Sequence, residues 1–385
     1  MTSLLDTLFN GLAIGSVLML AALGLAVVFG LMGVINMAHG ELMMLGAYTT
    51  YVVQNLLKTG PLQALFPAYI LIAIPLAFLV SGLAGLLLEK TVIRRLYGRP
   101  LETLLATWGV SLILQQLVRS VSTAFFMGLV LALVLGLGLP RVLPAAWLRQ
   151  RWSPLLKLGS WLLAGGLGIA LAALAAQTRP LRLPWFSARN IEVTAPQWLR
   201  GSIELAGVTM PTGRLFIIAL TALSLIAVHW FLQKSVWGIR IRAVTQNRSM
   251  SSCLGIPTDQ VDALSFLVGS GLAGVAGVAV TLLGSVGPNM GGNYIVDCFM
   301  VVVLGGVGKL LGTVIAALGI GILSYILGSG SLLLLWPQMP ATLNSIITFF
   351  ATTSMAKVLV FLLIVAFLQF RPSGLFPQKG RMVEA

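Results

Sequence analysis

Long apolar runs fill most of the chain and alternate with short polar connections. A membrane-spanning helix needs about 20 predominantly apolar residues, and most of the runs come near that length. Strands of a membrane barrel would alternate apolar and polar positions over about ten residues, whereas these runs are continuous. The pattern predicts an all-α, polytopic transmembrane helical bundle with about 9–11 spanning helices, some of them interrupted. The runs cover residues 8–32, 40–57, 68–88, 103–119, 123–140, 155–177, 214–233, 262–285, 294–305, 311–328 and 354–370.

The composition agrees with lipid as the main solvent. Hydrophobic residues make up 58% of the 385 residues and charged residues only 9%, against about a quarter charged in soluble domains. So few charges could not cover a globule with polar surface. We therefore expect one transmembrane domain over residues 1–385.

The net charge of +14 has a membrane explanation, because cytoplasmic loops of membrane proteins collect Lys and Arg. Nucleic acid is therefore not an expected partner. Counting crossings between the basic loops places the C-terminus inside and the N-terminus outside, with the 178–213 loop outside despite Arg179, Arg182, Arg189 and Arg200. The expected cytoplasmic clusters are Lys90, Arg94, Arg95 and Arg99; Arg149, Arg151 and Lys157; Lys234, Arg240, Arg242 and Arg248; and Arg371, Lys379 and Arg381.

Residues for catalysis or for metal binding are scarce. Two cysteines and two histidines form neither a disulfide framework nor a metal-ligand pattern. Gly305–Lys309 superficially resembles a phosphate-binding loop, but Leu310 stands where Ser or Thr is required. We expect no catalytic residue, no metal and no cofactor, and any ATP hydrolysis must take place on another chain.

Two polar or glycine-rich breaks interrupt the apolar pattern, at Asn36–Glu41 and at Gly305–Lys309. Such backbone is tolerated at membrane depth where it is buried in protein or lines a wet cavity, and paired breaks can mark a transport pathway. Another polar face recurs every four residues at 107, 111 and 115, and its hydroxyl and amide groups suit a small neutral solute. Hydrogen bonds between helices use the same residue types and remain an alternative. The pathway candidates are Asn36, His39, Glu41, Thr107, Trp108, Ser111 and Gln115.

Glu41 and Asp297 are the main carboxylates within the apolar runs. An intramembrane carboxylate is costly and therefore suggests a function. The alternative is that each caps a helix or pairs with a neighbour near an interface, and for Asp297 we favour that alternative. Gly269, Ala273 and Gly277, spaced by four, predict close helix packing.

A basic, partly amphipathic segment runs from Gly238 to Pro257 between two spanning runs and ends on Gly and Pro signals. It could enter a groove on a cytoplasmic partner. It could equally lie on anionic lipid. The residue pattern alone leaves both possibilities open.

At these motifs the chain resembles the permease family of high-affinity branched-chain amino acid importers, and within it the urea permeases. The family resemblance rests on NMAHGELMMLGAY (36–48), on 238–257 and 269–277, and on FMVVVLGGVGKLLG (299–312). The urea subgroup is indicated by ATWGVSLILQQ (106–116), AVTQNRSMSSCLGIP (243–257), VGPNMGGNYIVDCFMVVVLGGVG (286–308) and RPSGLFPQKGR (371–381). The resemblance covers roughly residues 1–121 and 187–385.

The resemblance implies a multi-pass subunit of a bacterial inner-membrane importer for urea. Its partners would be a second permease subunit, two ATP-binding subunits and a periplasmic substrate-binding protein, which would set most of the specificity. It also implies that 240–257 is the coupling helix received by an ATPase. The coupling candidates are Arg240, Arg242, Ala243, Gln246, Asn247, Gly255 and Ile256.

The segment 122–186 is additional to the family pattern and is expected to add two helices. A branched-chain amino acid permease of the same architecture is the nearest alternative function. The polar face around Ser111 offers no charge partners for a zwitterion, which favours urea. An ATP-independent channel is disfavoured by the coupling-like segment, and an intramembrane enzyme by the scarcity of His, Cys and paired carboxylates.

Overall fold

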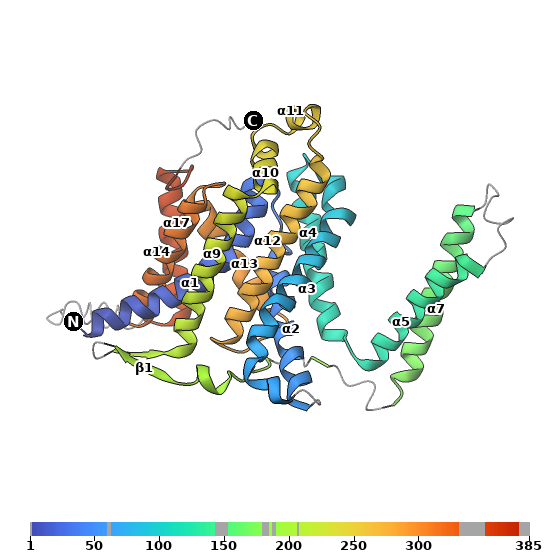
Figure 1. Ribbon diagram of the computed structural model, residues 1–385, viewed down its shortest axis with the longest axis horizontal. Coiled ribbons are helices and arrows are strands. Elements are labelled where there is room, and N and C mark those ends of the chain that lie inside the picture. Colours follow the sequence, from blue (N-terminus) through green and yellow to red (C-terminus); the bar gives the residue numbers. More distant parts are fainter. Residues whose placement is uncertain are drawn as a thin grey trace. The chain divides into compact units, whose positions relative to one another are not determined.

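The computed structural model describes residues 2–59, 63–142, 153–178, 185–186, 190–205, 208–330 and 351–376 (Figure 1). The chain divides into two compact units, Met1–Ser111 with Glu192–Ala385 and, separately, Leu112–Ile191. Every apolar run predicted from the sequence coincides with a helix, which confirms the all-α membrane architecture.

The larger unit consists of long helices joined by short connections. Helix α4 (Pro100–Ser120) begins in this unit and ends in the other one. The remaining elements are α1 (Thr2–Met32), α2 (His39–Thr59), η1 (Gln63–Ala68), α3 (Tyr69–Thr91), η2 (Ile93–Leu96), η3 (Gln197–Leu199), β1 (Ser202–Leu205), β2 (Val208–Pro211), α9 (Thr212–Lys234), α10 (Val236–Gln246), α11 (Arg248–Cys253), α12 (Thr258–Thr281), α13 (Met290–Gly305), α14 (Leu310–Gly328) and α17 (Thr353–Phe370).

Six helical stretches of the described chain are long and apolar enough to cross a membrane. Helix α13 has 16 residues and is about 24 Å long, which is short of the roughly 30 Å hydrocarbon core. Helix α2 carries several polar residues and packs against α12, α3 and α13, so its polar groups face protein. The six stretches are Leu5–Gly30, Gln63–Thr91, Pro100–Ser120, Thr212–Lys234, Thr258–Thr281 and Leu310–Gly328.

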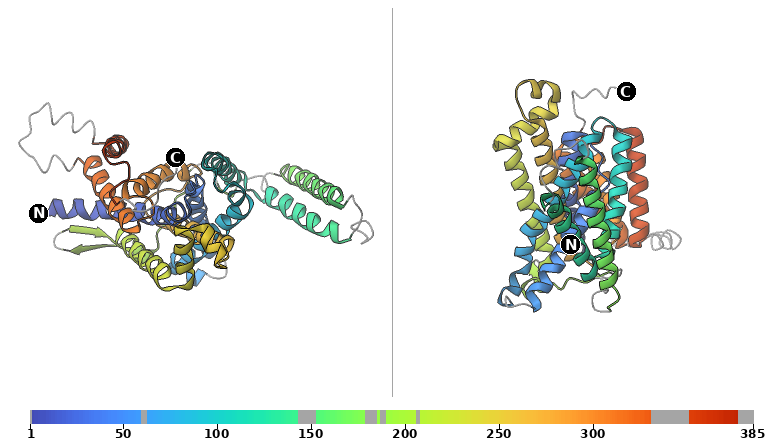
Figure 2. Two further views of the ribbon diagram at one scale, coloured as in Figure 1. Left: turned by 90° about the horizontal axis from the view of Figure 1, so that it is seen from above. Right: turned by 90° about the vertical axis from the view of Figure 1, so that its right-hand side faces the viewer.

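Helices α1 and α12 lie in the middle of this unit. Figures 1 and 2 show α1 running obliquely among its neighbours, and it packs against α14, α12, α9 and α13. Helix α12 packs along α3, α1 and α2 and is buried over most of its length. These two helices therefore link nearly all the others.

Small residues allow these helices to approach closely, as the spacing in α12 predicted. A Cβ atom on Gly24 would overlap the carbonyl of Gly269, and one on Gly277 would overlap the carbonyl of Met43. Gly46 of α2 is pressed in the same way against Gly274. Close backbone contact of this kind is what small residues provide where lipid gives no hydrophobic driving force between helices.

Strands β1 and β2 form an antiparallel hairpin, with Ser202 opposite Pro211 and Glu204 opposite Thr209. The hairpin leads directly into α9, and α9 into α10 and α11. The hairpin and the α10–α11 pair lie at opposite ends of the unit (Figure 1). This placement agrees with the expectation that the 178–213 loop and the 238–257 segment lie on opposite sides of the membrane.

The smaller unit contains two helices, α5 (Thr123–Val142) and α7 (Ser153–Ala175), packed side by side. They are antiparallel, because Gly128 near the start of α5 meets Gly168 near the end of α7, whereas Gly136 meets Trp161. Trp185 lies beside the start of α5. Its backbone N–H donates to Val121 O at 2.9 Å, and its indole N–H donates to Thr123 Oγ1 at 2.8 Å. The two ends of this helix pair therefore lie close together within the smaller unit.

Some predicted features fall outside the described residues. They include most of the expected external arginines and the link between α5 and α7. The residues concerned are Arg149, Arg151, Arg179, Arg182, Arg189, Lys379 and Arg381.

Candidate functional site

The first polar break forms the connection from α1 to α2, and Asn36 shapes its end. The Asn36 Oδ1 atom accepts a hydrogen bond from the Ala38 backbone N–H at 3.0 Å, and its carbonyl accepts from His39 N–H at 3.3 Å. This is the local turn that an Asn side chain makes before a helix start. Asn36 is fully buried, so the break lies within the protein, as polar backbone at membrane depth requires.

His39 opens α2 and reaches back to α1. Its Nε2 atom lies 3.0 Å from the Ala21 carbonyl oxygen. Because a carbonyl only accepts, Nε2 is assigned the proton, and Nδ1 is left as an acceptor. The ring is fully buried and packs against Gly24, where a Cβ atom would lie 3.0 Å from the ring carbon.

Glu41 occupies the first turn of α2, where the helix dipole favours a negative charge. Ser111 Oγ of α4 donates to Glu41 Oε1 at 3.1 Å. Gly291 of α13 lies flat against the carboxylate, since a Cβ atom there would come within 2.6 Å of it. The carboxylate is therefore enclosed by three helices.

Thr107 provides a further link from α4. Its Oγ1 atom accepts from the Met37 backbone N–H at 3.1 Å and donates to the Leu104 carbonyl at 3.1 Å. Thr107 is fully buried and Ser111 nearly so. The α4 face predicted from the four-residue spacing thus contacts the break between α1 and α2.

Five of the seven pathway candidates come together in one place, which we call the internal polar cluster: Asn36, His39, Glu41, Thr107 and Ser111. Trp108 points elsewhere and is 52% exposed. Gln115 is half-buried and belongs to the smaller unit. Several cluster members make hydrogen bonds between helices, the structural role weighed for them above. Unused capacity is nevertheless left: within the described ranges, neither Asn36 Nδ2 nor His39 Nδ1 has a hydrogen-bond partner.

The basic segment, 238–257, forms two short helices and not the single helix that the resemblance implied. Helix α10 ends at Gln246, because Asn247 adopts an extended conformation (φ −154°, ψ 103°). The Asn247 side chain then caps α11 by accepting from Met250 N–H at 2.9 Å. Asn is among the best residues at a helix N-cap, which explains the break at this position.

The ends of the segment are also fixed locally. Ser235 caps α10 by accepting from Gly238 N–H at 2.9 Å. Arg242 donates to the Leu232 carbonyl and to Gln233 Oε1, which ties α10 to the end of α9. Gly255 has φ +80°, a conformation that glycine adopts without strain.

The remaining coupling candidates are more exposed to solvent. Arg240 stacks over the Trp237 ring at 4.9 Å. A Cβ atom on Gly255 would meet nothing within 4 Å, so this turn is open to the outside. Ala243 and Ile256 are partly buried, and Gln246 and Asn247 are exposed.

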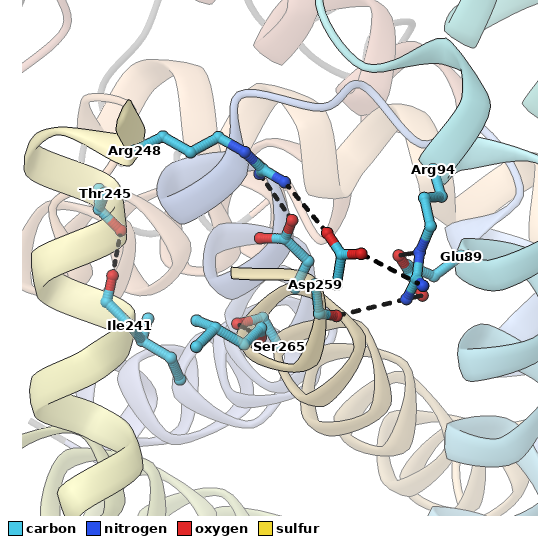
Figure 3. A network of polar contacts seen from close by, with 9 residues as sticks. Glu89, Arg94, Ile241, Thr245, Arg248, Asp259 and Ser265 are labelled. Carbon is cyan, nitrogen blue, oxygen red and sulfur yellow. Dashed lines mark hydrogen bonds and ion pairs between the residues drawn. The ribbon is translucent and has the colours of Figure 1, made fainter. Parts of the chain in front are cut away.

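Charged residues near α11 form a network that sequence reasoning missed (Figure 3). Arg248 Nη1 lies 2.6 Å from Asp262 Oδ2, and Arg248 Nη2 lies 3.9 Å from Asp259 Oδ1. On the other side, Arg94 donates to both carboxylate oxygens of Glu89 at 3.0 Å. Arg94 also reaches Asp259, with 3.7 Å between Nη1 and Oδ2.

This network combines two buried acids and one exposed acid, Asp259, with partly exposed bases. Glu89 and Asp262 are 0% and 2% exposed, whereas the side chains of Arg94 and Arg248 are 34% and 44% exposed. The Glu89 hydrogen bond raises the pKa of Arg94 further above its ordinary value. Burial raises the pKa of Tyr97, whose ring lies 4.9 Å beneath the Arg248 guanidinium, so its phenol stays neutral. A clue lay in the sequence, because Glu89 and Asp262 sit at the ends of apolar runs beside basic clusters.

A second ion pair lies between α13 and α17. Lys357 Nζ is 3.0 Å from Asp297 Oδ2. Asp297 stands inside α13, so of the two roles expected for it, capping and pairing with a neighbour, the structure shows pairing. Its partner Lys357 was not identified from the sequence. A cavity of about 150 Å³ adjoins this pair and is otherwise mostly apolar, with Ile14, Leu18 and Phe361 among its walls.

Comparison with known proteins supplies the family. The family described as "Branched-chain amino acid transport system / permease component" matches residues 7–368. The permease protein LivH of the high-affinity branched-chain amino acid transport system of Salmonella typhimurium is 28% identical over 319 residues, covering 83% of this chain and 84% of the relative. LivH of Escherichia coli K12 gives the same values, and BraD of Pseudomonas aeruginosa is 25% identical over 320 residues with the same coverage.

No solved structure matches the chain. The family match extends over nearly the whole length and agrees with the helical architecture and the apolar spans. The relatives are named as permease proteins of transport systems. This multi-pass membrane protein belongs to the branched-chain amino acid transport system permease family.

Proposed function

We propose that this chain is the permease subunit of an ATP-driven importer that takes urea into a bacterial cell. Its partners would be a second permease subunit, two ATP-binding subunits and a periplasmic binding protein. The family membership supports the transport role, and the motifs at 106–116, 243–257 and 286–308 favour the urea subgroup. The observation that carries the choice of solute is the unused hydrogen-bonding capacity in the internal polar cluster.

Urea offers one carbonyl oxygen and two amino groups and carries no charge. Asn36 Nδ2 is a buried donor, and His39 Nδ1 is a buried acceptor once Nε2 donates to Ala21. A donor for the carbonyl and an acceptor for an amino group are what urea requires. Leaving either atom unpaired in the bilayer interior is costly, so a passing neutral solute would find favourable partners there.

Coupling to ATP hydrolysis would run through the basic segment. It presents charged and polar groups at one end of the larger unit, and the resemblance assigns 240–257 to contact with an ATPase. In the helix-in-groove mode of recognition, a short helix enters a cleft on a partner. The two short helices α10 and α11 offer such an element, with Gln246, Asn247 and Gly255 exposed to solvent.

Import of a branched-chain amino acid is the second candidate. The names of LivH and BraD state that solute class for those proteins. The Asp297–Lys357 pair beside an apolar cavity offers opposite charges next to aliphatic walls, which the face around Ser111 does not. A zwitterion with an aliphatic side chain could use such a place.

Uptake of labelled urea and labelled leucine by cells with and without the gene separates the two candidates. Complementation with Asn36→Ser keeps an oxygen for the Ala38 N–H and removes the amide donor. His39→Leu removes the Nδ1 acceptor together with the Nε2 donor to Ala21. We expect energy-dependent urea uptake to be lost with the gene and reduced in both variants. Loss of leucine uptake with urea uptake unchanged would overturn the urea proposal and favour the second candidate.

A further inference from the structure

We propose that Arg248 is a positioning residue that fastens the basic segment to α12, so that movement of the segment is passed into the membrane helices. The inference rests on the proposed function, because it assumes that an ATPase acts on this segment. It concerns the contact inside the permease that receives the motion, and not the ATPase contact itself. Arg248 is the first residue of α11, and its side chain points away from the segment toward Asp259 (Figure 3).

Three groups outside the segment hold the Arg248 guanidinium. Asp262 and Asp259 of α12 lie at 2.6 and 3.9 Å, and the Tyr97 ring lies 4.9 Å away. Asp262 is the strongest of these contacts, because its carboxylate is buried and a buried charge needs a partner. The exposed Asp259 contact is long and contributes little by itself.

Asp259 extends the connection to α3. It faces Arg248 on one side and Arg94 on the other, and Arg94 is fixed by two hydrogen bonds to the buried Glu89. The Arg94 Nη2 atom also donates to the Asp259 carbonyl at 3.3 Å. Through this chain of contacts α11 is tied to the first turn of α12 and to the end of α3.

The neighbouring packing explains why a polar contact is needed here. Ile241 of α10 is buried in an apolar group with Val261 and Leu272 of α12. Between Ile241 and Arg248 the segment encloses a cavity of about 270 Å³, lined also by Thr245, Gln246 and Ser265. The segment therefore touches α12 at two places, an apolar one at Ile241 and an ionic one at Arg248, with space between them.

This arrangement would pass a movement of α11 to α12 and to the helices packed against it. Helix α12 packs along α1, α2 and α3, and α2 carries His39 and Glu41 of the internal polar cluster. A displacement of α11 held by Arg248 would move the start of α12 and with it the helices around the cluster. Without Arg248, the segment could move into the cavity while α12 stayed in place.

The test uses the complete transporter in lipid vesicles and measures solute uptake and ATP hydrolysis together. The informative variant is Arg248→Ala combined with Asp262→Asn, which removes the ion pair without leaving a buried charge. We expect this variant to assemble and hydrolyse ATP, with uptake per ATP reduced at least about fivefold, a typical size for coupling between sites. Arg248→Lys keeps a charge for Asp262 and should retain an intermediate ratio, which also covers the case in which the double variant fails to assemble.

Arg99→Ala is the matched control, since Arg99 forms an exposed pair with Glu102 on the same side of the unit. Its uptake per ATP should equal that of the wild type. An unchanged ratio in both the double variant and Arg248→Lys would overturn the inference while leaving the importer intact. A wild-type complex whose uptake does not depend on ATP would overturn the proposed function, so the two failures can be told apart.

Discussion

The internal polar cluster and the network around Arg248 both bury polar side chains, but they stabilise them by different interactions. Both place polar side chains where burial is costly. The cluster uses hydrogen bonds that Ser111 and His39 donate and that Thr107 accepts, and it leaves a donor and an acceptor unused. The network pairs full charges, with Glu89 and Asp262 buried and the bases partly exposed.

The difference indicates that the two regions have different roles, contact with the solute for the cluster and mechanical connection for the network. Unused neutral groups give a passing solute partners without holding it tightly. Paired charges resist separation, because removing one partner leaves the other buried and uncompensated. A region with unused hydrogen-bonding atoms suits a pathway and a region of paired charges suits a mechanical connection, and substitutions that exchange these properties test the distinction.

The largest effect is expected from Arg248→Ala alone. Loss of the cation leaves the Asp262 carboxylate buried without its closest partner and should cost about 3 kcal/mol of unfolding free energy. Denaturant unfolding of the purified permease in detergent measures this loss of unfolding free energy. Adding Asp262→Asn should restore most of the loss. If the single variant is as stable as the wild type, the network is not a structural connection.

Gly291→Ala should have the next largest effect, on the cluster side. The added methyl group would lie 2.6 Å from the Glu41 carboxylate, and overpacking of this kind costs about 2 kcal/mol. The same unfolding experiment applies. Gly292→Ala is the matched control, because a Cβ atom there would meet nothing within 4 Å. Equal stability of the two variants would show that α13 does not pack closely on Glu41.

Ser111→Ala should cost less, about 1 kcal/mol, since it removes one hydrogen bond to Glu41. Glu41→Gln retains an oxygen for the Ser111 hydroxyl and should cost no more than Ser111→Ala. Unfolding midpoints of the two variants, compared with that of Arg248→Ala, measure the contrast between the hydrogen-bonded cluster and the ion-paired network. A loss for Glu41→Gln as large as that for Arg248→Ala would remove the contrast.

The smallest effect is expected from Arg99→Ala. Both side chains of the Arg99–Glu102 pair are exposed. Exposed ion pairs contribute less than about 1 kcal/mol to the unfolding free energy. High salt should leave the stability of this variant and of the wild type nearly equal. A large loss would mean that surface charge, and not burial, determines the strength of the pairs on this side of the unit.

The sequence predicted the helices well and their contacts poorly. Apolar runs marked every helix of the membrane part, because length and hydropathy are local properties. The break at Asn247 was missed, although Asn followed by a short polar stretch is a helix-capping signal. The spacing at 107 and 111 correctly gave one face of α4, but Trp108 turned out to be exposed.

Partners distant in sequence could not be read from it. Ser111 and Glu41 are 70 positions apart, and Lys357 and Asp297 are 60 apart. Which carboxylate meets which base depends on how α13, α14 and α17 pack, and one-dimensional patterns do not contain that information. The unused atoms of Asn36 and His39 likewise became visible only with every neighbour in place.

The most direct test of the proposed function is uptake of labelled urea into vesicles that contain the complete transporter, with and without ATP and with excess unlabelled leucine. We predict ATP-dependent urea accumulation that leucine does not compete away and that falls in Asn36→Ser. ATP-dependent accumulation of labelled leucine without accumulation of urea would contradict the urea assignment and identify this permease as an amino acid importer subunit.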